Sequence, residues 1–483
     1  MTTPASSTRI APRVLIVGAG LSGLMLAILF ERMGDIEYSI LERASAAKPL
    51  GSAMSLTPSI QILFEQLGMG EELKKISLPS PVANLYDEEL NLLGAIVHPK
   101  TLDRIGQRIL LPRPDLFDLL LSKIPAERML WGKRVLKVDE DDEANKDQVT
   151  ITCADGSQYA ADMVVGADGV YSSVRQNMYR VMSEQEILPK EDDEPLNVGF
   201  ACMVGITSAM DPEKYPELKD DFAHFRSVVG GVRHNWGAIN MPNNKFTWQF
   251  NLQYLDEKEA KQKLFMNSEW GPESNKEMLD EFKELPNPFG GKMADFINET
   301  PPELVSRVFL EYKLFKTWYH GRCVLVGDAC HKVALMSREK MLPGGGAGAV
   351  NAFQDAVILA NCLYDVEDRS VSSLQAAFQS YYEQRYEGAK EAYNTSEVMS
   401  KVMSGLTWQD RLARWLVMRM PQWVQQRNYE KAAAYRPQVM FLPQVGDHGM
   451  VPALPQKPCA RYLALQSKAV QAEVSTATGS AVV

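Results

Sequence analysis

Three glycines, Gly18, Gly20 and Gly23, constrain the fold of this chain more than any other feature. They follow the apolar run Arg13 to Val17, which has the composition of a buried strand, and they open the stretch Ser22 to Met33, which has the length of a helix. Glycines at this spacing permit a tight turn, close approach of a pyrophosphate, and close packing of the helix on the strand. The helix then directs the positive end of its dipole at the phosphates. The sequence therefore predicts a dinucleotide-binding unit.

A second apolar run, Ile36 to Leu41, extends this unit to a strand, a helix and a strand of the parallel type. Glu42 ends the run, where a carboxylate can accept hydrogen bonds from a ribose diol; an ordinary surface glutamate is the alternative. The stretch Val14 to Phe30 also has the composition of a signal anchor. The glycines inside it, and the new strand that follows, favour the buried strand and helix.

Composition and charge narrow the class of protein. The chain has 483 residues, of which 45% are hydrophobic, so it can bury a large core as two or three packed units. Its formal net charge of -10 repels polyphosphates and no local basic patch offsets it, so we expect no nucleic-acid partner. The six cysteines lack CxxC pairs and, with the six histidines, show no metal-ligand cluster. We expect no metal and a reducing, cytoplasmic compartment.

Two later strand-like runs end in an aspartate beside a glycine. The first is Val-Val-Gly-Ala before Asp168 and Gly169, and the second is Val-Leu-Val before Gly327 and Asp328. A glycine-rich run at residues 344–348 follows the second. In open α/β sheets, ligands bind beyond the carboxyl ends of the strands. These segments are therefore candidates for binding the same ligand as the first glycine loop.

On these motifs the sequence resembles the flavin-dependent aromatic hydroxylases and epoxidases, including fungal secondary-metabolite enzymes, from about Arg13 to Asp365. The resemblance implies FAD as cofactor, NADPH or NADH as cosubstrate, and transfer of one oxygen atom from O2 through a flavin C4a-hydroperoxide. The substrate implied is a small, mostly apolar molecule with an aromatic or isoprenoid framework. Hydroxylation and epoxidation use the same oxygen donor, so the choice stays open. Because the chemistry is centred on the flavin, no side chain is assigned a catalytic role.

The resemblance also implies roles for individual residues. Asp328 matches the aspartate that holds the ribityl hydroxyls of FAD. Asp168 and Gly169 match a motif that braces the pyrophosphate region, with Arg175 as a candidate phosphate partner. Arg113, in the pattern R-x-x-L-x-x-x-L, matches an arginine that reaches the cofactor. For both arginines a position on a helix surface is the alternative.

The glycine-rich run completes the implied site. Gly346 and Gly348 match backbone that lies beside the flavin pyrimidine edge, where a helix N-terminus would stabilise the reduced anionic flavin. The loop at Pro343 is expected to help enclose the substrate. Eight residues, 333–340, precede this loop where family members have almost none. The insertion could enlarge the active-site mouth, displace the flavin, or reflect a misassigned splice boundary.

The predicted fold class is α/β: a doubly wound FAD-binding domain, an inserted β-rich substrate domain and a helical C-terminal region. Strand-like runs at Val198 to Ile206, Asn235 to Met241 and Phe246 to Leu255 mark the inserted domain. The boundaries we predict are 10–185 for the first part of the FAD-binding domain, 186–314 for the substrate domain, 315–375 for the return segment, 376–470 for the helical region and 471–483 for a disordered tail.

Alternatives remain for the function. A second G-x-G-x-x-G, typical of two-dinucleotide reductases, is missing from the sequence, and Trp236-Gly-Ala-Ile239 lacks the second tryptophan of the flavin-halogenase motif. These absences favour oxygen transfer over a flavin oxidoreductase without it, such as a halogenase. A non-catalytic or impaired FAD-binding scaffold is the other alternative, motivated by the insertion at 333–340. Oligomeric state cannot be read from the sequence.

Two groups of aromatic residues have competing interpretations. Trp236, Met241, Trp248 and Phe250 could line the substrate pocket, but aromatic residues that alternate along strands more often form core. An amphipathic helix at 406–420, with tryptophans and arginines, could contact a membrane surface and make the protein peripheral. We expect it instead to dock on the body of the protein.

Overall fold

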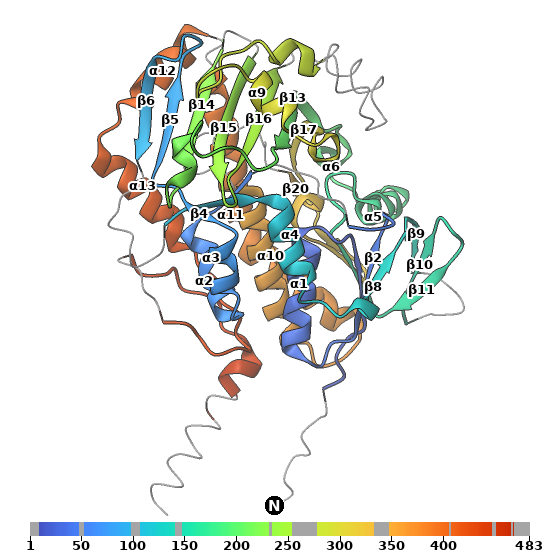
Figure 1. The fold of residues 1–483 in the computed structure, drawn as a ribbon. Coiled ribbons are helices and arrows are strands. Elements are labelled where there is room, and N and C mark those ends of the chain that lie inside the picture. The colour runs from blue at the N-terminus through green and yellow to red at the C-terminus, as the bar shows by residue number, and fades with distance from the viewer. Residues whose placement is uncertain are drawn as a thin grey trace, which may run out of the picture.

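The computed structural model describes residues 9–47, 53–97, 107–140, 147–230, 234–253, 278–332, 347–404, 407–446 and 451–464, together with residue 467. A six-stranded sheet organises the first part of the molecule (Figure 1). Its strands, in spatial order, are β18 (Tyr319–His320), β19 (Cys323–Leu325), β12 (Met163–Gly166), β1 (Val14–Val17), β2 (Tyr38–Glu42) and β8 (Met129–Trp131). From β19 to β8 the neighbours run parallel. Strands β1, β12 and β19 are buried throughout, which explains their uninterrupted apolar sequences.

Different elements cover the two faces of this sheet (Figure 1). Helix α1 (Leu21–Met33) lies beside α10 (Ala347–Tyr364) on one face, and α11 (Val371–Ser404) packs on α10. An antiparallel sheet of three strands lies on the other side, with α5 (Ser173–Glu184) against it. Its strands are β9 (Val135–Asp139), β10 (Val149–Cys153) and β11 (Gln158–Ala161). The prediction of a doubly wound α/β domain is confirmed.

One predicted strand, Tyr159 to Val165, is two strands in different sheets. Strand β11 ends at Ala161 and β12 begins at Met163. Asp162 between them is buried, and its Oδ1 accepts a hydrogen bond of 3.0 Å from Nη2 of Arg13. Both strands are short and apolar, so a single polar residue gave no visible boundary in the sequence.

An eight-stranded sheet forms the second part of the molecule. Its strands, in spatial order, are β20 (His331–Lys332), β17 (Ser306–Leu314), β13 (Asn197–Ile206), β16 (Lys245–Gln253), β15 (His234–Met241), β14 (His224–Val229), β5 (Val82–Tyr86) and β6 (Leu92–Val97). The predicted β-rich domain is therefore present. Two of its strands, β5 and β6, come from residues that the predicted boundaries place in the first domain, because β14 pairs in parallel with β5. The boundaries themselves stay a prediction.

The four residues with competing interpretations in this sheet are all core. Trp236, Trp248 and Phe250 lie on the face covered by the segment around α9 (Ala294–Asn298), and Met241 lies on the opposite face. None of the four is more than 2% exposed. The two indole N–H groups donate to protein oxygens, Pro286 O and Thr300 Oγ1, each at 2.8 Å. The core interpretation is therefore correct for these residues.

Smaller elements connect the two large sheets. They are the antiparallel strands β3 (Ala53–Leu56), β7 (Ile109–Pro112) and β4 (Leu78–Pro79), and the helices α2 (Pro58–Gln66), α3 (Gly70–Lys75), α4 (Arg113–Leu121) and α6 (Lys190–Asp193). Strand β7 contacts β15 of the large sheet and leads directly into α4.

The C-terminal region is helical up to residue 434. Helix α11 is followed by α12 (Trp408–Met418) and α13 (Gln422–Ala434). Residues 435–446 and 451–459, which we predicted to be helical, form irregular chain that returns to α10. There, Asn361 donates to Gln438 O at 2.9 Å and accepts from Met440 N at 2.8 Å.

All six cysteines are free and buried. Among the described helices, none combines the length and the hydropathy that crossing a bilayer would need. The predicted tail at 471–483 lies outside the described residues.

Candidate cofactor site

Four neighbouring strands of the parallel sheet end at predicted site residues. Leu325, Gly166, Val17 and Leu41 form one row across β19, β12, β1 and β2. The site residues that follow this row are Asp328 after β19, Asp168 and Gly169 after β12, Gly18 after β1, and Glu42 at the end of β2. The structure therefore brings these separate segments together at one edge of the sheet, where open α/β folds bind ligands.

The glycine loop has the close approaches that its spacing predicts. Gly18 has φ of +104°, and a Cβ there would lie 2.6 Å from Ala167 O. A Cβ at Gly23 would lie 2.2 Å from Gly18 O, so only glycine lets α1 begin this close to β1. Gly20 is the N-cap of α1, with no side-chain capping bond, and the first turn carries no acidic residue. The positive end of this helix is therefore available to an anionic ligand.

Glu42 is fixed beside the glycine loop. Its Oε2 accepts a hydrogen bond from Ala19 N at 2.9 Å, and its Oε1 accepts one from Ala44 N at 2.8 Å. Each carboxylate oxygen can accept a further bond. The carboxylate is thus part of the loop structure and can still receive ligand hydroxyls.

Asp168 has one oxygen in use and one without a partner. Its Oδ2 accepts from Ser173 N at 2.6 Å and from Ser173 Oγ at 2.7 Å, at the start of α5. Its Oδ1 is buried and has no hydrogen-bond partner among the described residues. Such an oxygen costs free energy unless a donor reaches it. Gly169 beside it has φ of +80°, and nothing lies within 4 Å of where its Cβ would be.

Arg175 makes several contacts with the protein itself. Its Nη1 donates to Ala329 O at 2.7 Å, and its Nη2 donates to Val170 O at 2.5 Å. The guanidinium also lies 4.0 Å from the centre of the Phe315 ring. It is buried and joins the turn after β12 to the turn after β19. The structure thus gives Arg175 a bracing role between two turns, and its contact with a phosphate stays a prediction.

Arg113 lies near enough to Asp328 to feel its charge, although the two are far apart in the sequence. Asp328 sits in the 3-10 turn η5 (Gly327–Ala329), and Arg113 is the first residue of α4. Burial lowers the pKa of Arg113, and the negative charge of Asp328 opposes that shift. Asp328 also forms an ion pair with Lys332, which the sequence did not suggest. The alternative of an exposed position on the helix surface does not hold for Arg113, which is at least half-buried near this turn; its contact with the cofactor stays a prediction.

The glycine-rich run is only partly described. Pro343, Gly346 and the insertion at 333–340 lie outside the described residues. Gly348 lies in the first turn of α10, and nothing lies within 4 Å of where its Cβ would be.

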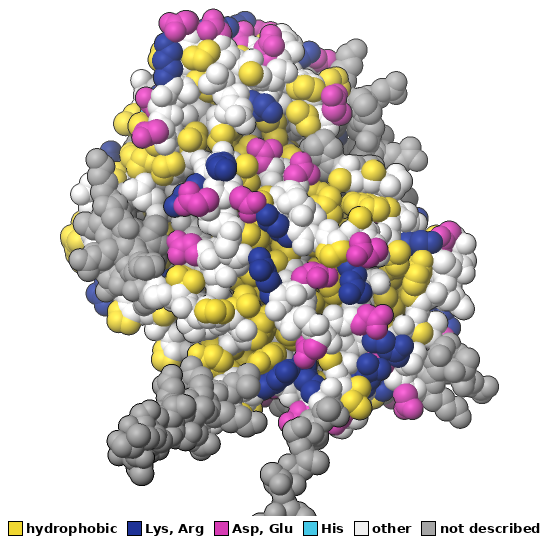
Figure 2. Space-filling view, turned by 60° about the horizontal axis from the view of Figure 1, so that its bottom comes forward, with side chains coloured by type: hydrophobic (Ala, Val, Ile, Leu, Met, Phe, Trp, Pro, Cys, Tyr) yellow, Lys and Arg dark blue, Asp and Glu magenta, His cyan; other side chains and the backbone are white. Residues whose placement is uncertain are grey.

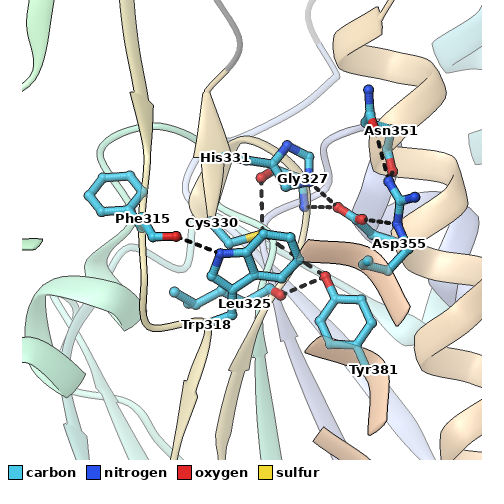
Figure 3. A network of polar contacts seen from close by, with 10 residues as sticks. Phe315, Trp318, Leu325, Gly327, Cys330, His331, Asn351, Asp355 and Tyr381 are labelled. Atoms are coloured by element: carbon cyan, nitrogen blue, oxygen red, sulfur yellow. Dashed lines mark hydrogen bonds and ion pairs between the residues drawn. The ribbon is translucent and has the colours of Figure 1, made fainter. Parts of the chain in front are cut away.

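A buried ionic network, which the sequence did not reveal, holds the Asp328 turn in place (Figure 3). Asp355 of α10 accepts hydrogen bonds from His331 Nε2 at 2.5 Å, Arg385 Nε at 2.8 Å and Gly327 N at 2.9 Å. Arg385 also donates to Asn351 Oδ1 at 2.8 Å. Burial alone would raise the pKa of Asp355, but His331 and Arg385 lower it below its usual value. Polar residues inside the otherwise apolar helix α10 were the available signal.

The same network brings Cys330, His331 and Asp355 together, with one potential metal-ligand atom of each within 4.8 Å of the others. The Asp355 carboxylate already binds the Arg385 cation, and Cys330 Sγ donates to Gly327 O at 3.3 Å. Burial raises the pKa of the Cys330 thiol well above its usual value. Because both oxygens of the Asp355 carboxylate are already bonded, to Arg385, His331 and Gly327, this cluster is better explained as an ion network than as a metal site.

These features fit a flavin dinucleotide. The glycine loop and the open helix end suit a pyrophosphate, Glu42 suits a ribose, and the unpartnered Oδ1 of Asp168 can accept from a hydroxyl. Fold and site thus define a dinucleotide-binding protein.

Comparison with known proteins supports FAD as the dinucleotide. Residues 12–191 match the model of the FAD binding domain. FAD-dependent monooxygenase ptmM of Penicillium ochrochloron is 29% identical over 402 residues, which cover 80% of this chain and 87% of the relative. FAD-dependent monooxygenase ausM of Emericella nidulans is 27% identical over 464 residues, covering 91% and 88%. Residues 12–191 thus match an FAD binding domain, and the chain is similar over 80% or more of its length to FAD-dependent monooxygenases.

Solved structures share the fold. Klebsiella pneumoniae HpxO, complexed with FAD and uric acid, superposes with a TM-score of 0.66 at 19% identity, covering 87% of this chain and 95% of HpxO. A salicylate hydroxylase in a substrate complex gives a TM-score of 0.60 at 19% identity, covering 88% and 97%.

Proposed function

We propose that this protein uses NADPH or NADH and O2 to hydroxylate or epoxidise a small, mostly apolar substrate with an aromatic or isoprenoid framework. The observation that carries the proposal is the convergence of Gly18, Glu42, Asp168 and Asp328 at the ends of four adjacent strands. The similarity to FAD-dependent monooxygenases supports an oxidoreductase, and the nicotinamide, oxygen and substrate are our inference from that similarity.

The residues at these strand ends would hold FAD. The glycine loop and the N-terminus of α1 would bind the pyrophosphate, Glu42 a ribose, and Asp328 the ribityl hydroxyls. Bound FAD would supply the redox chemistry, by accepting reducing equivalents from NAD(P)H and activating O2. Arg113 would contribute a positive charge beside Asp328, held in place by the start of α4.

One face of the eight-stranded sheet suits an apolar substrate. Ile239 and Phe225 on this face form a cluster with Leu110 of β7, the strand that leads to Arg113. The face therefore looks toward the cofactor domain. An apolar wall of this kind would help to exclude water, which protects an oxygen-transfer reaction from side reactions.

A few polar groups interrupt this apolar face. Asn251 donates to Asn235 Oδ1 at 2.6 Å, and both side chains are buried. Asn251 Oδ1 and Thr247 Oγ1 are buried without a hydrogen-bond partner among the described residues. Apolar surface with a few placed polar groups is the usual composition of a small-molecule site. We therefore infer that the substrate carries at least one hydroxyl or N–H donor.

Surface charge favours a small molecule over a nucleic acid as partner. On the face shown in Figure 2, Lys and Arg side chains are interspersed with Asp and Glu. The chain as a whole carries a formal net charge of -10. A polyphosphate would meet both signs of charge on this face rather than a continuous basic surface.

The test is the absorbance spectrum of the purified protein, followed without oxygen after addition of NADPH or NADH and a panel of aromatic and prenylated compounds. We expect bound oxidised flavin that bleaches faster with one compound, and release of an oxygenated product when O2 is admitted. Flavin that never bleaches with either nicotinamide would contradict the proposal and favour the scaffold or halogenase-like alternatives. A protein that cannot take up FAD would also contradict it.

A further inference from the structure

Helices α12 and α13 present apolar side chains to solvent. Trp408, Leu412, Trp415 and Leu416 on α12 are 71%, 49%, 50% and 55% exposed, and Trp423 on α13 is 66% exposed. We call these five residues the 408–423 patch. The four on α12 have the spacing of a single helix face. Among the described tryptophans, the exposed ones all belong to this patch.

A different face attaches α12 to the body of the protein. Met418 is 8% exposed, and its Cβ lies 3.0 Å from where a Cβ of Gly94 in β6 would be. Met418 belongs to the apolar cluster that Ile239 and Phe225 form on one face of the eight-stranded sheet, and Val417 packs against that cluster. Helix α12 therefore docks on the body of the protein, as expected, but through Met418 and Val417 rather than through the tryptophan stripe, which stays exposed.

The segment that carries the patch is basic in an otherwise acidic chain, although Lys431 in it pairs with Glu391 of α11. Residues 407–431 contain five basic residues and two acidic ones, a formal charge of +3 against -10 for the whole chain. The basic residues are Arg411, Arg414, Arg419, Arg427 and Lys431, and the acidic ones are Asp410 and Glu430. The Asp410 carboxylate accepts from Thr407 N at 2.9 Å and from Thr407 Oγ1 at 2.7 Å in a capping box. Arg419 lies over the Trp415 ring, 4.5 Å from its centre.

We propose that the 408–423 patch binds the surface of a phospholipid bilayer that contains anionic lipids. Indole rings prefer the boundary between headgroups and acyl chains, and arginines beside them can reach the phosphates while their stems stay apolar. Helix α12 has 11 residues and is about 16 Å long, roughly half the thickness of the hydrocarbon core. It therefore lies in the plane of the interface.

A bilayer fits this patch better than a second copy of the chain. A two-fold interface brings the same patch of both copies together, so the basic residues of one would face those of the other. Like charges across an interface oppose association. An anionic lipid surface instead satisfies both the apolar and the basic character of the patch.

The test is flotation of the intact protein with vesicles of phosphatidylcholine alone and with vesicles in which about a third is phosphatidylserine. We expect binding to the anionic vesicles that weakens with added salt. The variant Trp408→Ala/Trp415→Ala/Trp423→Ala should reduce the bound fraction by about tenfold. The variant Arg411→Gln/Arg419→Gln should lose the preference for phosphatidylserine.

A matched control replaces three exposed apolar residues elsewhere, Leu136→Ala/Ile187→Ala/Leu454→Ala, each of which is 52–55% exposed. It should bind vesicles like the unchanged protein. All variants should retain FAD and melting temperature, because the changed side chains are exposed. Failure of the intact protein to float with either vesicle would overturn the proposal, as would equal binding by the triple tryptophan variant. A dimer detected by light scattering in the unchanged protein, but not in the triple tryptophan variant, would also overturn the proposal. The patch would then be an interface between two copies of the chain.

Discussion

His331 Nε2 lies 2.5 Å from Oδ2 of Asp355, and both side chains are shielded from solvent. The same oxygen accepts from Gly327 N, and the other binds Arg385 Nε. Asp355 therefore joins α10 and α11 to the turn that carries Asp328. We regard it as a positioning residue, because it acts on the cofactor site through that turn.

The variant Asp355→Asn should destabilise the protein by about 3–5 kcal/mol, since it leaves the buried Arg385 cation without its counter-charge. FAD affinity should also fall, because the Gly327 turn loses its anchor. Urea unfolding measures the first effect, and fluorescence titration of FAD, under conditions where the variant is folded, measures the second. Asp368→Asn, which changes an exposed carboxylate, is the control. Unchanged FAD affinity in a folded Asp355→Asn protein would show that the network is structural only.

The Asp355 carboxylate should account for part of the loss of folding stability at low pH. Burial opposes ionisation of Asp355, but His331 and Arg385 lower its pKa below the usual value in the folded protein. In the unfolded chain its pKa is about 3.9. Below that pH the unfolded state binds a proton that the folded state does not, so the free energy of unfolding falls as pH drops. Urea unfolding between pH 6 and pH 3 should show a shallower fall for Asp355→Asn than for the unchanged protein; parallel curves would contradict this.

The sequence was sufficient to predict which residues gather at the sheet edge where we propose that the cofactor binds. It was not sufficient to predict the buried ion network around Asp355 that holds this edge in place. Gly18, Gly23 and Glu42 form a short local pattern whose geometry follows from sterics, so their positions could be predicted. Asp355 and Arg385 pair only because α10 and α11 pack together, and no local pattern encodes that pairing. Which face of α12 docks could not be predicted for a related reason: the helix has apolar residues on two faces, and only tertiary packing selects the face with Met418.

Gly18→Ala should abolish FAD retention. A Cβ at Gly18 would lie 2.6 Å from Ala167 O, on backbone of the neighbouring strand end. Gly34→Ala is a matched control, because Gly34 also has a positive φ, +80°, but nothing lies within 4 Å of where its Cβ would be. It should cost only the backbone strain, about 1–2 kcal/mol, and keep FAD. The measurement is the amount of bound flavin per chain in both purified variants. Equal retention would mean that FAD binding does not need the close approach of Gly18 to Ala167.

The six thiols should react slowly with a thiol reagent at pH 8. All are buried, and burial raises the pKa of Cys153, Cys323 and Cys330, and that of Cys362 to about 11. Since the thiolate is the reactive form, few are ionised at that pH. Native protein should release almost no chromophore within minutes, whereas protein in denaturant should show all six. A rapid native reaction would identify a thiol that becomes exposed by local opening.

The face of the eight-stranded sheet that carries Ile239 and Asn251 allows a prediction of how the substrate is recognised. Asn251→Leu removes a buried polar group whose Oδ1 has no partner among the described residues. If a substrate donor binds there, its loss costs about 1–2 kcal/mol of binding, which is roughly 5–30-fold in KM. Because the chemistry is centred on the flavin, kcat should change less. Thr300→Ala is the control: Thr300 accepts from Trp248 Nε1 on the opposite face, so its loss should lower the melting temperature and leave KM unchanged. Steady-state kinetics of both variants, with the compound that speeds flavin bleaching, measures KM and kcat separately. An unchanged KM for Asn251→Leu would place the substrate elsewhere on the sheet.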